Sequence, residues 1–201
     1  MLIVGINGSP KKEGNTAFLL REGLAAAAGA GAETALIHVA DALADQKIPY
    51  CTQCSNPCRG ACSRNNTLGE AFDLLRRADG ILLGSPVYFG SVSAQLKAFW
   101  DKSRVLRKEK ALYNVVGAGV AVGGSRFGGQ ETTLKALFDM MLIQGMMIVG
   151  DGFIEADCGH QGSCGQAPAE KDEFAIARVR LTGRRLAEVA AATAPLRRHR
   201  L

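Results

Sequence analysis

The sequence predicts an α/β fold, a doubly wound sheet of five parallel strands with helices on both faces. Strand-like and helix-like segments alternate five times along the 201 residues. The strand candidates are continuously apolar, which is typical of strands that are covered on both faces of a parallel sheet. Right-handed crossovers between such strands give an open doubly wound sheet. The length and the 47% hydrophobic content suit one domain over residues 1–201.

Five short runs rich in Val, Ile and Leu carry the strand prediction. The first begins at Leu2, so the sheet starts at the N-terminus. The expected strands are 2–7 (LIVGIN), 33–39 (ETALIHV), 79–88 (DGILLGSPVY), 115–122 (VVGAGVAV) and 146–153 (MMIVGDGF).

Helices are predicted between these runs from capping residues and helical periodicity. An Asn-Thr pair opens the first helix, which two glycines end after Ala28. Leu96, Phe99 and Trp100 stand at i, i+3 and i+4, which is the spacing of a helix face that packs on a core. The expected helices are 15–28, 68–78, 94–106, 131–144 and 170–192.

The net charge of +5 is local to the C-terminal end of the chain. From residue 174 onward there are seven arginines and one acid, Glu188, whereas the preceding residues carry 17 basic and 18 acidic side chains. A solvated helix face and tail account for this pattern, and interleaved aromatics for base stacking are missing. We therefore expect no nucleic-acid partner. The arginines are Arg178, Arg180, Arg184, Arg185, Arg197, Arg198 and Arg200.

Membrane association and secretion are not expected either. No apolar run reaches the roughly 18 residues that a membrane span needs, because Gln144 and several glycines interrupt the candidates. The N-terminus lacks the basic region and the cleavage site of a secretory signal. We expect a cytoplasmic protein.

The loop after the first strand, residues 8–16, combines glycines with hydroxyl and amide side chains directly before a helix start. Free backbone N–H groups and the positive end of a helix dipole form an anion cradle at such a place. Ser9, Asn15 and Thr16 can donate hydrogen bonds to phosphate oxygens, and Lys11 can add charge. The alternative is a plain turn followed by a helix cap. Neither a Walker A nor a GxGxxG pattern can be read here.

The loops after the third and fourth strands are unusual as well, and ligands bind outside the carboxyl ends of the strands in such sheets. Residues 84–91 place two aromatics, Tyr88 and Phe89, at the sheet edge, where planar aromatic ligands stack. Residues 123–129 form a glycine-rich loop with one cation, Arg126, which would stabilise negative charge on a reduced flavin ring. The alternative for Arg126 is an exposed loop charge.

Four cysteines lie within twelve residues, in a polar loop at about 47–66 between the second and third strands. In a reducing compartment such a cluster points to metal or redox chemistry and not to disulfides. The compact spacing of Cys51, Cys54, Cys58 and Cys62 favours a [4Fe–4S] cluster, with zinc or free redox thiols as alternatives. Beyond the fifth strand, Cys158, His160 and Cys164 form a candidate dithiol or additional metal site, or are ordinary side chains.

Three segments, GSPKKEGNT, SPVYFGSVSAQLKAFWD and GGSRFGGQET, resemble the FMN-binding loops of the NADPH-dependent FMN reductase and iron–sulfur flavoprotein family, in register over roughly residues 1–150. The resemblance implies a flavodoxin-like fold with the FMN phosphate on Ser9, Lys11, Asn15 and Thr16. It implies isoalloxazine contacts from residues 86–90 and 123–126, which are Pro86, Val87, Tyr88, Phe89, Gly90, Gly123, Gly124, Ser125 and Arg126.

The iron–sulfur branch of that family has a compact cysteine motif at the same place. Its usual spacing is CxxCxxC and then a longer gap, so this chain departs by one residue at the third ligand. The resemblance also implies homodimers or homotetramers in which cluster and flavin approach across subunits.

The expected function is therefore that of an FMN-binding iron–sulfur flavoprotein. It moves electrons between a [4Fe–4S] cluster, FMN and a redox partner, either ferredoxin-like or NAD(P)H. Because the cofactors carry the chemistry, we assign no catalytic acid, base or nucleophile. One alternative is an NAD(P)H-dependent FMN or quinone reductase without a cluster. Another is a flavin electron carrier that has no turnover of its own.

Overall fold

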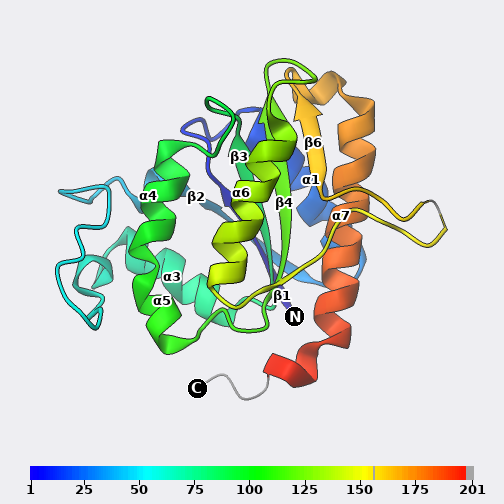
Figure 1. Cartoon of the computed structure of the whole chain (residues 1–201). Coiled ribbons are helices and arrows are strands. Elements are labelled where there is room, and N and C mark those ends of the chain that lie inside the picture. The colour runs from blue at the N-terminus through cyan, green and yellow to red at the C-terminus, as the bar shows by residue number, and fades with distance from the viewer. Residues whose placement is uncertain (156, 198–201) are drawn as a thin grey trace.

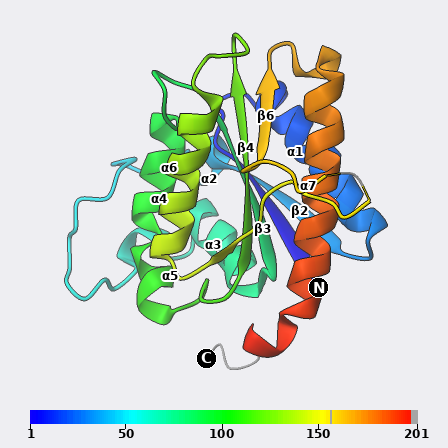
Figure 2. The same cartoon turned by 45° about the vertical axis from the view of Figure 1, so that its right-hand side comes forward.

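The computed structural model describes residues 1–155 and 157–197. A central sheet is covered by helices on both faces (Figures 1 and 2). All strand pairs are parallel, and the order β2-β1-β3-β4-β5 confirms the predicted doubly wound, flavodoxin-like sheet. The order reverses between β1 and β3. The strands are β1 (Leu2–Asn7), β2 (Glu33–His38), β3 (Gly80–Pro86), β4 (Val116–Gly123), β5 (Met147–Ile148) and β6 (Ser163–Gln166).

α1 and α7 cover one face of the sheet, and the other helices lie on the opposite face or at its edge (Figure 2). α1 packs against α7 so closely that a Cβ on Gly183 would collide with the carbonyl group of Gly23. The helices are α1 (Asn15–Gly29), α2 (Val39–Ala42), α3 (Thr67–Arg77), α4 (Ala94–Lys102), α5 (Arg104–Glu109), α6 (Gln130–Ile143) and α7 (Glu173–Ala192), with short 3-10 turns η1 (Ala61–Ser63), η2 (Ala169–Lys171) and η3 (Ala194–Arg197).

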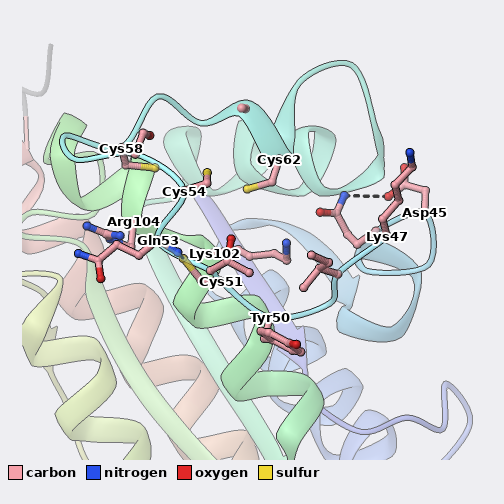
Figure 3. Close-up of a pocket in the computed structure, with 15 residues that line it drawn as sticks. Asp45, Lys47, Tyr50, Cys51, Gln53, Cys54, Cys58, Cys62, Lys102 and Arg104 are labelled. Atoms are coloured by element: carbon pink, nitrogen blue, oxygen red, sulfur yellow. Dashed lines mark hydrogen bonds between the residues drawn. The ribbon is translucent and has the colours of Figure 1, made fainter.

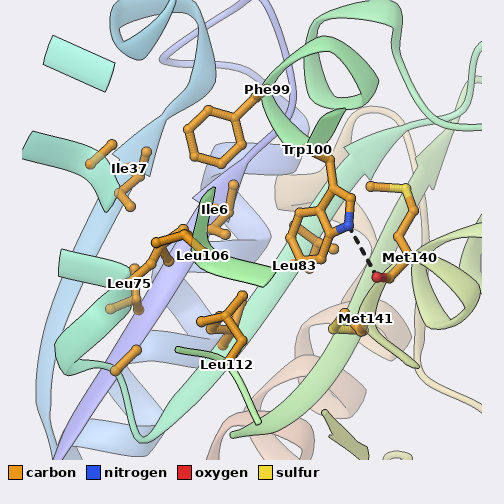
Figure 4. Close-up of a cluster of buried hydrophobic side chains, with 14 of the residues drawn as sticks. Ile6, Ile37, Leu75, Leu83, Phe99, Trp100, Leu106, Leu112, Met140 and Met141 are labelled. Carbon is orange, nitrogen blue, oxygen red and sulfur yellow. Dashed lines mark hydrogen bonds between the residues drawn. The ribbon is translucent and has the colours of Figure 1, made fainter. Parts of the chain in front are cut away.

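The core on the α3–α4–α6 face fixes the position of α4 (Figure 4). Phe99 is fully buried and stacks edge-to-face on Phe72, with the ring centroids 5.5 Å apart. Trp100 donates its indole N–H to the carbonyl oxygen of Met140 at 3.0 Å, which ties α4 to α6. The predicted apolar face of this helix is therefore confirmed, and the helix is anchored along its length.

The fifth predicted strand, 146–153, is wrong in its extent. β5 covers only two residues, and the chain then leaves the sheet before returning as β6, which pairs with β4 farther along. Gly150 and Gly152 lie in this departing segment, where each packs against the backbone of residues 158–160 and a side chain would not fit. Asp151 is buried there and pairs with Arg178 at 2.7 Å.

Two other expectations also change. The single helix predicted over 94–106 is two helices, since Ser103 ends α4 and its hydroxyl donates to the carbonyl of Trp100 at 2.6 Å. The polar loop predicted at about 47–66 is not wholly irregular, because it contains the 3-10 turn η1.

Ion pairs neutralise much of the basic C-terminal segment. Arg178 pairs with Asp151 and Asp157, and other arginines of α7 pair with Glu22 and Glu188. The predicted tail charges Arg198 and Arg200 lie outside the described residues. Among the residues that are described, no helix has both the length and the apolar character needed to cross a bilayer.

Candidate functional site

The loop after β1 lies beside the loop after β3. The backbone N–H of Gly8 donates to the carbonyl of Gly84 at 2.8 Å, and the hydroxyl of Ser93 donates to the carbonyl of Gly8 at 2.5 Å. A Cβ on Gly8 would lie 2.8 Å from the Gly84 oxygen, so the two backbones approach as closely as they do only because residue 8 is glycine.

The loop after β4 joins the same group. The N–H of Val87 donates to the carbonyl of Val122 at 2.8 Å. Gly90 and Gly129 both have left-handed backbone conformations, with φ of 75° and 98°, and a Cβ on Gly129 would lie 3.1 Å from the Cα of Gly90. The three predicted loops therefore meet at the carboxyl edge of the sheet, at the place where the strand order reverses.

The first turn of α1 has free hydrogen-bond donors at this edge. α1 begins after Gly14, which has no side chain to cap it. Ser9 is buried and its hydroxyl oxygen accepts from the N–H of Lys11 at 3.1 Å, which shapes the loop. Thr16 is only 2% exposed as a residue, yet its hydroxyl is not among the enclosed unpartnered atoms and forms no hydrogen bond within residues 1–155 and 157–197. Uncapped N–H groups and a free hydroxyl form the donor set of an anion site.

Asn15 has a second role that the sequence did not reveal. Its amide oxygen accepts from the N–H of Ala169 at 2.8 Å, so its NH₂ group is the part left to donate to a ligand. Ala167, two residues earlier, donates its N–H to the carbonyl of Gly123 at 2.8 Å. The segment after β6 thus forms a fourth wall of the carboxyl edge.

Tyr88 and Phe89, which follow β3, are exposed on the surface. Tyr88 and Ser91 exchange two backbone hydrogen bonds of 2.9 and 3.1 Å, which close a tight turn. Phe89 stands at the tip of this turn with φ of 51°, and its ring is fully exposed. Phe127, on the facing loop, is fully exposed as well. Exposed aromatic rings at a sheet edge are available to stack on a planar ligand.

Arg126 pairs with Asp172, the residue that caps the N-terminus of α7. Its guanidinium lies 3.4 Å from the carboxylate of Asp172, whose side chain is only 5% exposed. Burial would raise the pKa of Asp172, but N–H donors from Gln166 and Ala175 and the positive charge of Arg126 lower that pKa below its usual value. The expected loop cation is thus oriented and half-exposed.

A cavity of about 800 Å³ lies next to the β4 loop, between α6, β6 and α7. Arg126, Phe127, His160 and Cys164 line parts of it, but no residue of the loops after β1 and β3 does. Burial, followed by the nearby Glu131 and Asp151, raises the pKa of Cys164 to about 11. Cys158 is exposed and does not line this cavity. Cys158, His160 and Cys164 are therefore not gathered around it as a set.

The four cysteines of the loop line a second cavity of about 270 Å³, beside the junction of α4 and α5 (Figure 3). None of them is in a disulfide. The N–H of Gln53 donates to the sulfur of Cys51 at 3.4 Å. Burial raises the pKa of Cys62, and Lys102, whose side chain reaches the same cavity, acts against that rise. Within residues 1–155 and 157–197, no three His, Cys, Asp or Glu side chains stand close enough to hold one metal ion.

The base of the cysteine loop is fixed even though the thiols stand apart. Asn66 caps α3 by accepting from the N–H of Gly69 at 3.0 Å, and its amide donates to the carbonyl of Cys62 at 2.9 Å. Asp45 accepts from the N–H of Thr67 at 3.2 Å, across the neck of the loop. The segment between these two ends carries all four cysteines.

Comparison with known proteins gives consistent matches. Residues 1–161 match the NADPH-dependent FMN reductase family. The chain is 45% identical over 193 residues to a protein of Methanocaldococcus jannaschii named iron–sulfur flavoprotein, with 94% of this chain and 97% of that protein covered. A protein of Methanosarcina thermophila with the same name is 38% identical over 192 residues, with 94% and 95% covered. The crystal structure of a flavodoxin, WrbA-like protein from Agrobacterium tumefaciens matches with a TM-score of 0.69 at 20% identity, with 95% and 98% covered, which shows the shared fold.

Proposed function

Because the chain belongs to the NADPH-dependent FMN reductase family, we propose that this flavin-dependent oxidoreductase is an iron–sulfur flavoprotein. FMN would bind at the carboxyl edge of the sheet, and a [4Fe–4S] cluster would bind at the cysteine cavity. The observation that carries the proposal is the meeting of the loops after β1, β3 and β4 at one edge, in a chain 45% identical to a protein named iron–sulfur flavoprotein.

The FMN phosphate would lie at the start of α1. Ser9, Asn15 and Thr16 would donate side-chain hydrogen bonds, the uncapped N–H groups of the first turn would add backbone donors, and exposed Lys11 would add positive charge. The chemistry of this donor set fits a dianionic phosphate. The Ser9 hydroxyl accepts from the N–H of Lys11 and keeps its proton to donate, and the Thr16 hydroxyl has no partner among the described residues.

The isoalloxazine would lie between the tight turn after β3 and the loop after β4. Tyr88 would supply a stacking surface, and Arg126, oriented by Asp172, would place positive charge beside the ring. Backbone N–H and C=O groups of both loops would form hydrogen bonds with the edge of the isoalloxazine ring. The residues in this group are Pro86, Val87, Tyr88, Phe89, Gly90, Gly123, Gly124, Ser125 and Arg126.

The cluster would be held by Cys51, Cys54, Cys58 and Cys62. Four free thiols around one cavity fit a cubane cluster in type and number, and a backbone N–H already donates to one of the sulfurs. The thiols are not yet gathered, so cluster insertion would close the loop between its fixed ends at Asp45 and Asn66.

When bound, FMN supplies one- and two-electron transfer and the cluster supplies one-electron transfer. The protein groups bind and orient these cofactors and exclude competing reactions. A flavoprotein of this kind needs a redox partner, and we infer a ferredoxin-like protein or NAD(P)H as the donor. We also infer a homodimer or homotetramer in the cytoplasm.

The second candidate is an NAD(P)H-dependent reductase without a cluster, which the separation of the four thiols favours. Anaerobic reconstitution with iron, sulfide and FMN distinguishes the two. The iron–sulfur proposal expects four irons per chain, lost in Cys54→Ser and retained in the control Cys158→Ser, which changes an exposed cysteine outside the cavity. A chain that takes up no iron and whose flavin is bleached rapidly by NADPH supports the second candidate. The third candidate, a flavin electron carrier without turnover of its own, expects reduced ferredoxin to reduce the flavin stoichiometrically and NADPH to leave it oxidised.

A further inference from the structure

Lys102 is a buried lysine without a counter-charge from a carboxylate. It is the last residue of α4, and only 5% of it is exposed. Its ammonium makes no hydrogen bond or ion pair with any part of the chain that the structure describes. The side chain extends into the cavity that the four cysteines line, with the Cys62 sulfur nearby (Figure 3).

The ammonium opens onto this cavity, because its nitrogen is not among the fully enclosed, unpartnered polar atoms of the described residues. A positive charge that no carboxylate neutralises attracts an anion that occupies the same space. Asp45, the one carboxylate that lines the cavity, is engaged instead by the N–H of Thr67 and the amide of Gln46. The other acidic groups of the lining are the four thiols and the phenol of Tyr50, and only the thiols are ligands that a metal cluster would bind.

The other cation of the cavity is placed differently. Arg104, two residues farther along, lines the same cavity but is partly exposed to solvent. Arg104 can therefore turn into solvent, whereas the packed side chain of Lys102 holds its charge at the cavity. The two cations are not equivalent, and Lys102 is expected to have the larger effect on a bound anion.

We propose that Lys102 is the positioning residue of the cluster site, an ammonium that offsets the negative charge of the thiolate-bound [4Fe–4S] cluster and raises its reduction potential. The inference rests on the proposed function. Reduction adds a further electron to an assembly that its four thiolates already make anionic, so a fixed positive charge nearby favours the reduced form. Net charge and hydrogen bonds to sulfur are the means by which a protein sets such potentials.

The test compares Lys102→Met, which keeps length and removes charge, with Lys102→Arg, which keeps charge. Lys97→Met is the matched control, because Lys97 is an exposed lysine of the same helix that pairs with Asp101 at 2.7 Å on the surface. Each protein is reconstituted anaerobically, assayed for iron, and titrated by EPR to the cluster midpoint potential. Thermal melts of each variant before reconstitution report on folding.

We expect Lys102→Met to disfavour the reduced cluster about tenfold, a shift of about 59 mV for a one-electron couple. Lys102→Arg and Lys97→Met should stay near the wild-type potential. Loss of the cluster in Lys102→Met alone, with a normal melt, also supports the proposal. Lys102→Met protein that carries a complete cluster at the wild-type midpoint potential overturns the proposal. Equal shifts of the midpoint potential in Lys102→Met and Lys102→Arg also overturn it, because the arginine keeps the charge. Wild-type protein that binds no iron is a different result, which overturns the proposed function itself.

Discussion

The hydroxyl of Thr16 offers the sharpest test of the phosphate cradle. Thr16→Val removes that hydroxyl and keeps the shape of the side chain, which is 2% exposed in the first turn of α1. The hydroxyl has no partner within the described residues, so its loss costs the fold little. A hydrogen bond to a charged group contributes about 1.5–3 kcal/mol, and about 1.4 kcal/mol is tenfold in affinity. The Kd for FMN should therefore rise roughly 10- to 150-fold.

The assay is quenching of flavin fluorescence, measured for FMN and for riboflavin, which lacks the phosphate. Wild-type protein should prefer FMN, and Thr16→Val should lose much of that preference while its riboflavin affinity stays the same. Thr34→Val, at an exposed position of β2, is the control and should behave as wild type. If the ratio of the two affinities in Thr16→Val equals that of wild type, the phosphate does not contact this hydroxyl and the cradle is wrongly placed.

Three further predictions concern the framework of the site. Gly8→Ala should destabilise the fold by about 1–3 kcal/mol in urea, because its Cβ would lie 2.8 Å from a β3 carbonyl; Gly29→Ala, with no atom within 4 Å of its Cβ, is the control, and equal effects would contradict the close approach. The fold lowers the pKa of Asp172, so its contribution to the free energy of unfolding is present above the unfolded-state pKa of about 3.9 and is lost as pH falls through the folded value. Asp172→Asn should therefore weaken the loss of stability at acid pH, measured by urea unfolding at several pH values. An unchanged pH dependence would contradict this prediction. At pH 8, iodoacetamide followed by mass spectrometry should label exposed Cys158 much faster than Cys164, whose pKa burial raises to about 11; equal rates would show that Cys164 is not protected.

The loops of the site could be predicted because their position depends on strand order alone. Once 2–7, 79–88 and 115–122 are parallel strands, the residues that follow each must share one edge, and Gly8, Gly90 and Gly129 do. Local patterns were sufficient for this, since buried parallel strands are continuous apolar runs.

The parts that sequence reasoning missed depend on contacts between distant residues. β6 reads SCGQ, whose Ser and Gly are poor strand formers, and it is a strand only because β4 supplies its partner. The approach of Ala169 to Asn15 and of Asp172 to Arg126 follows from that strand, so neither contact was predictable. In the sequence, Lys102 looks like any other lysine of a helix. Its burial depends on the position of the loop that begins near residue 47, which packs beside the end of α4.

α4 begins in one site and ends in the other. Ser93, which caps it, donates its hydroxyl to the carbonyl of Gly8 in the proposed FMN loops, and its last residue, Lys102, lines the cysteine cavity. Nine residues at about 1.5 Å each set a spacing of about 13 Å along the axis, and one extra residue would turn Lys102 by about 100° away from the thiols. Substitutions along the solvent side of this helix should therefore be tolerated freely, whereas insertions or deletions of a single residue should uncouple the two ends.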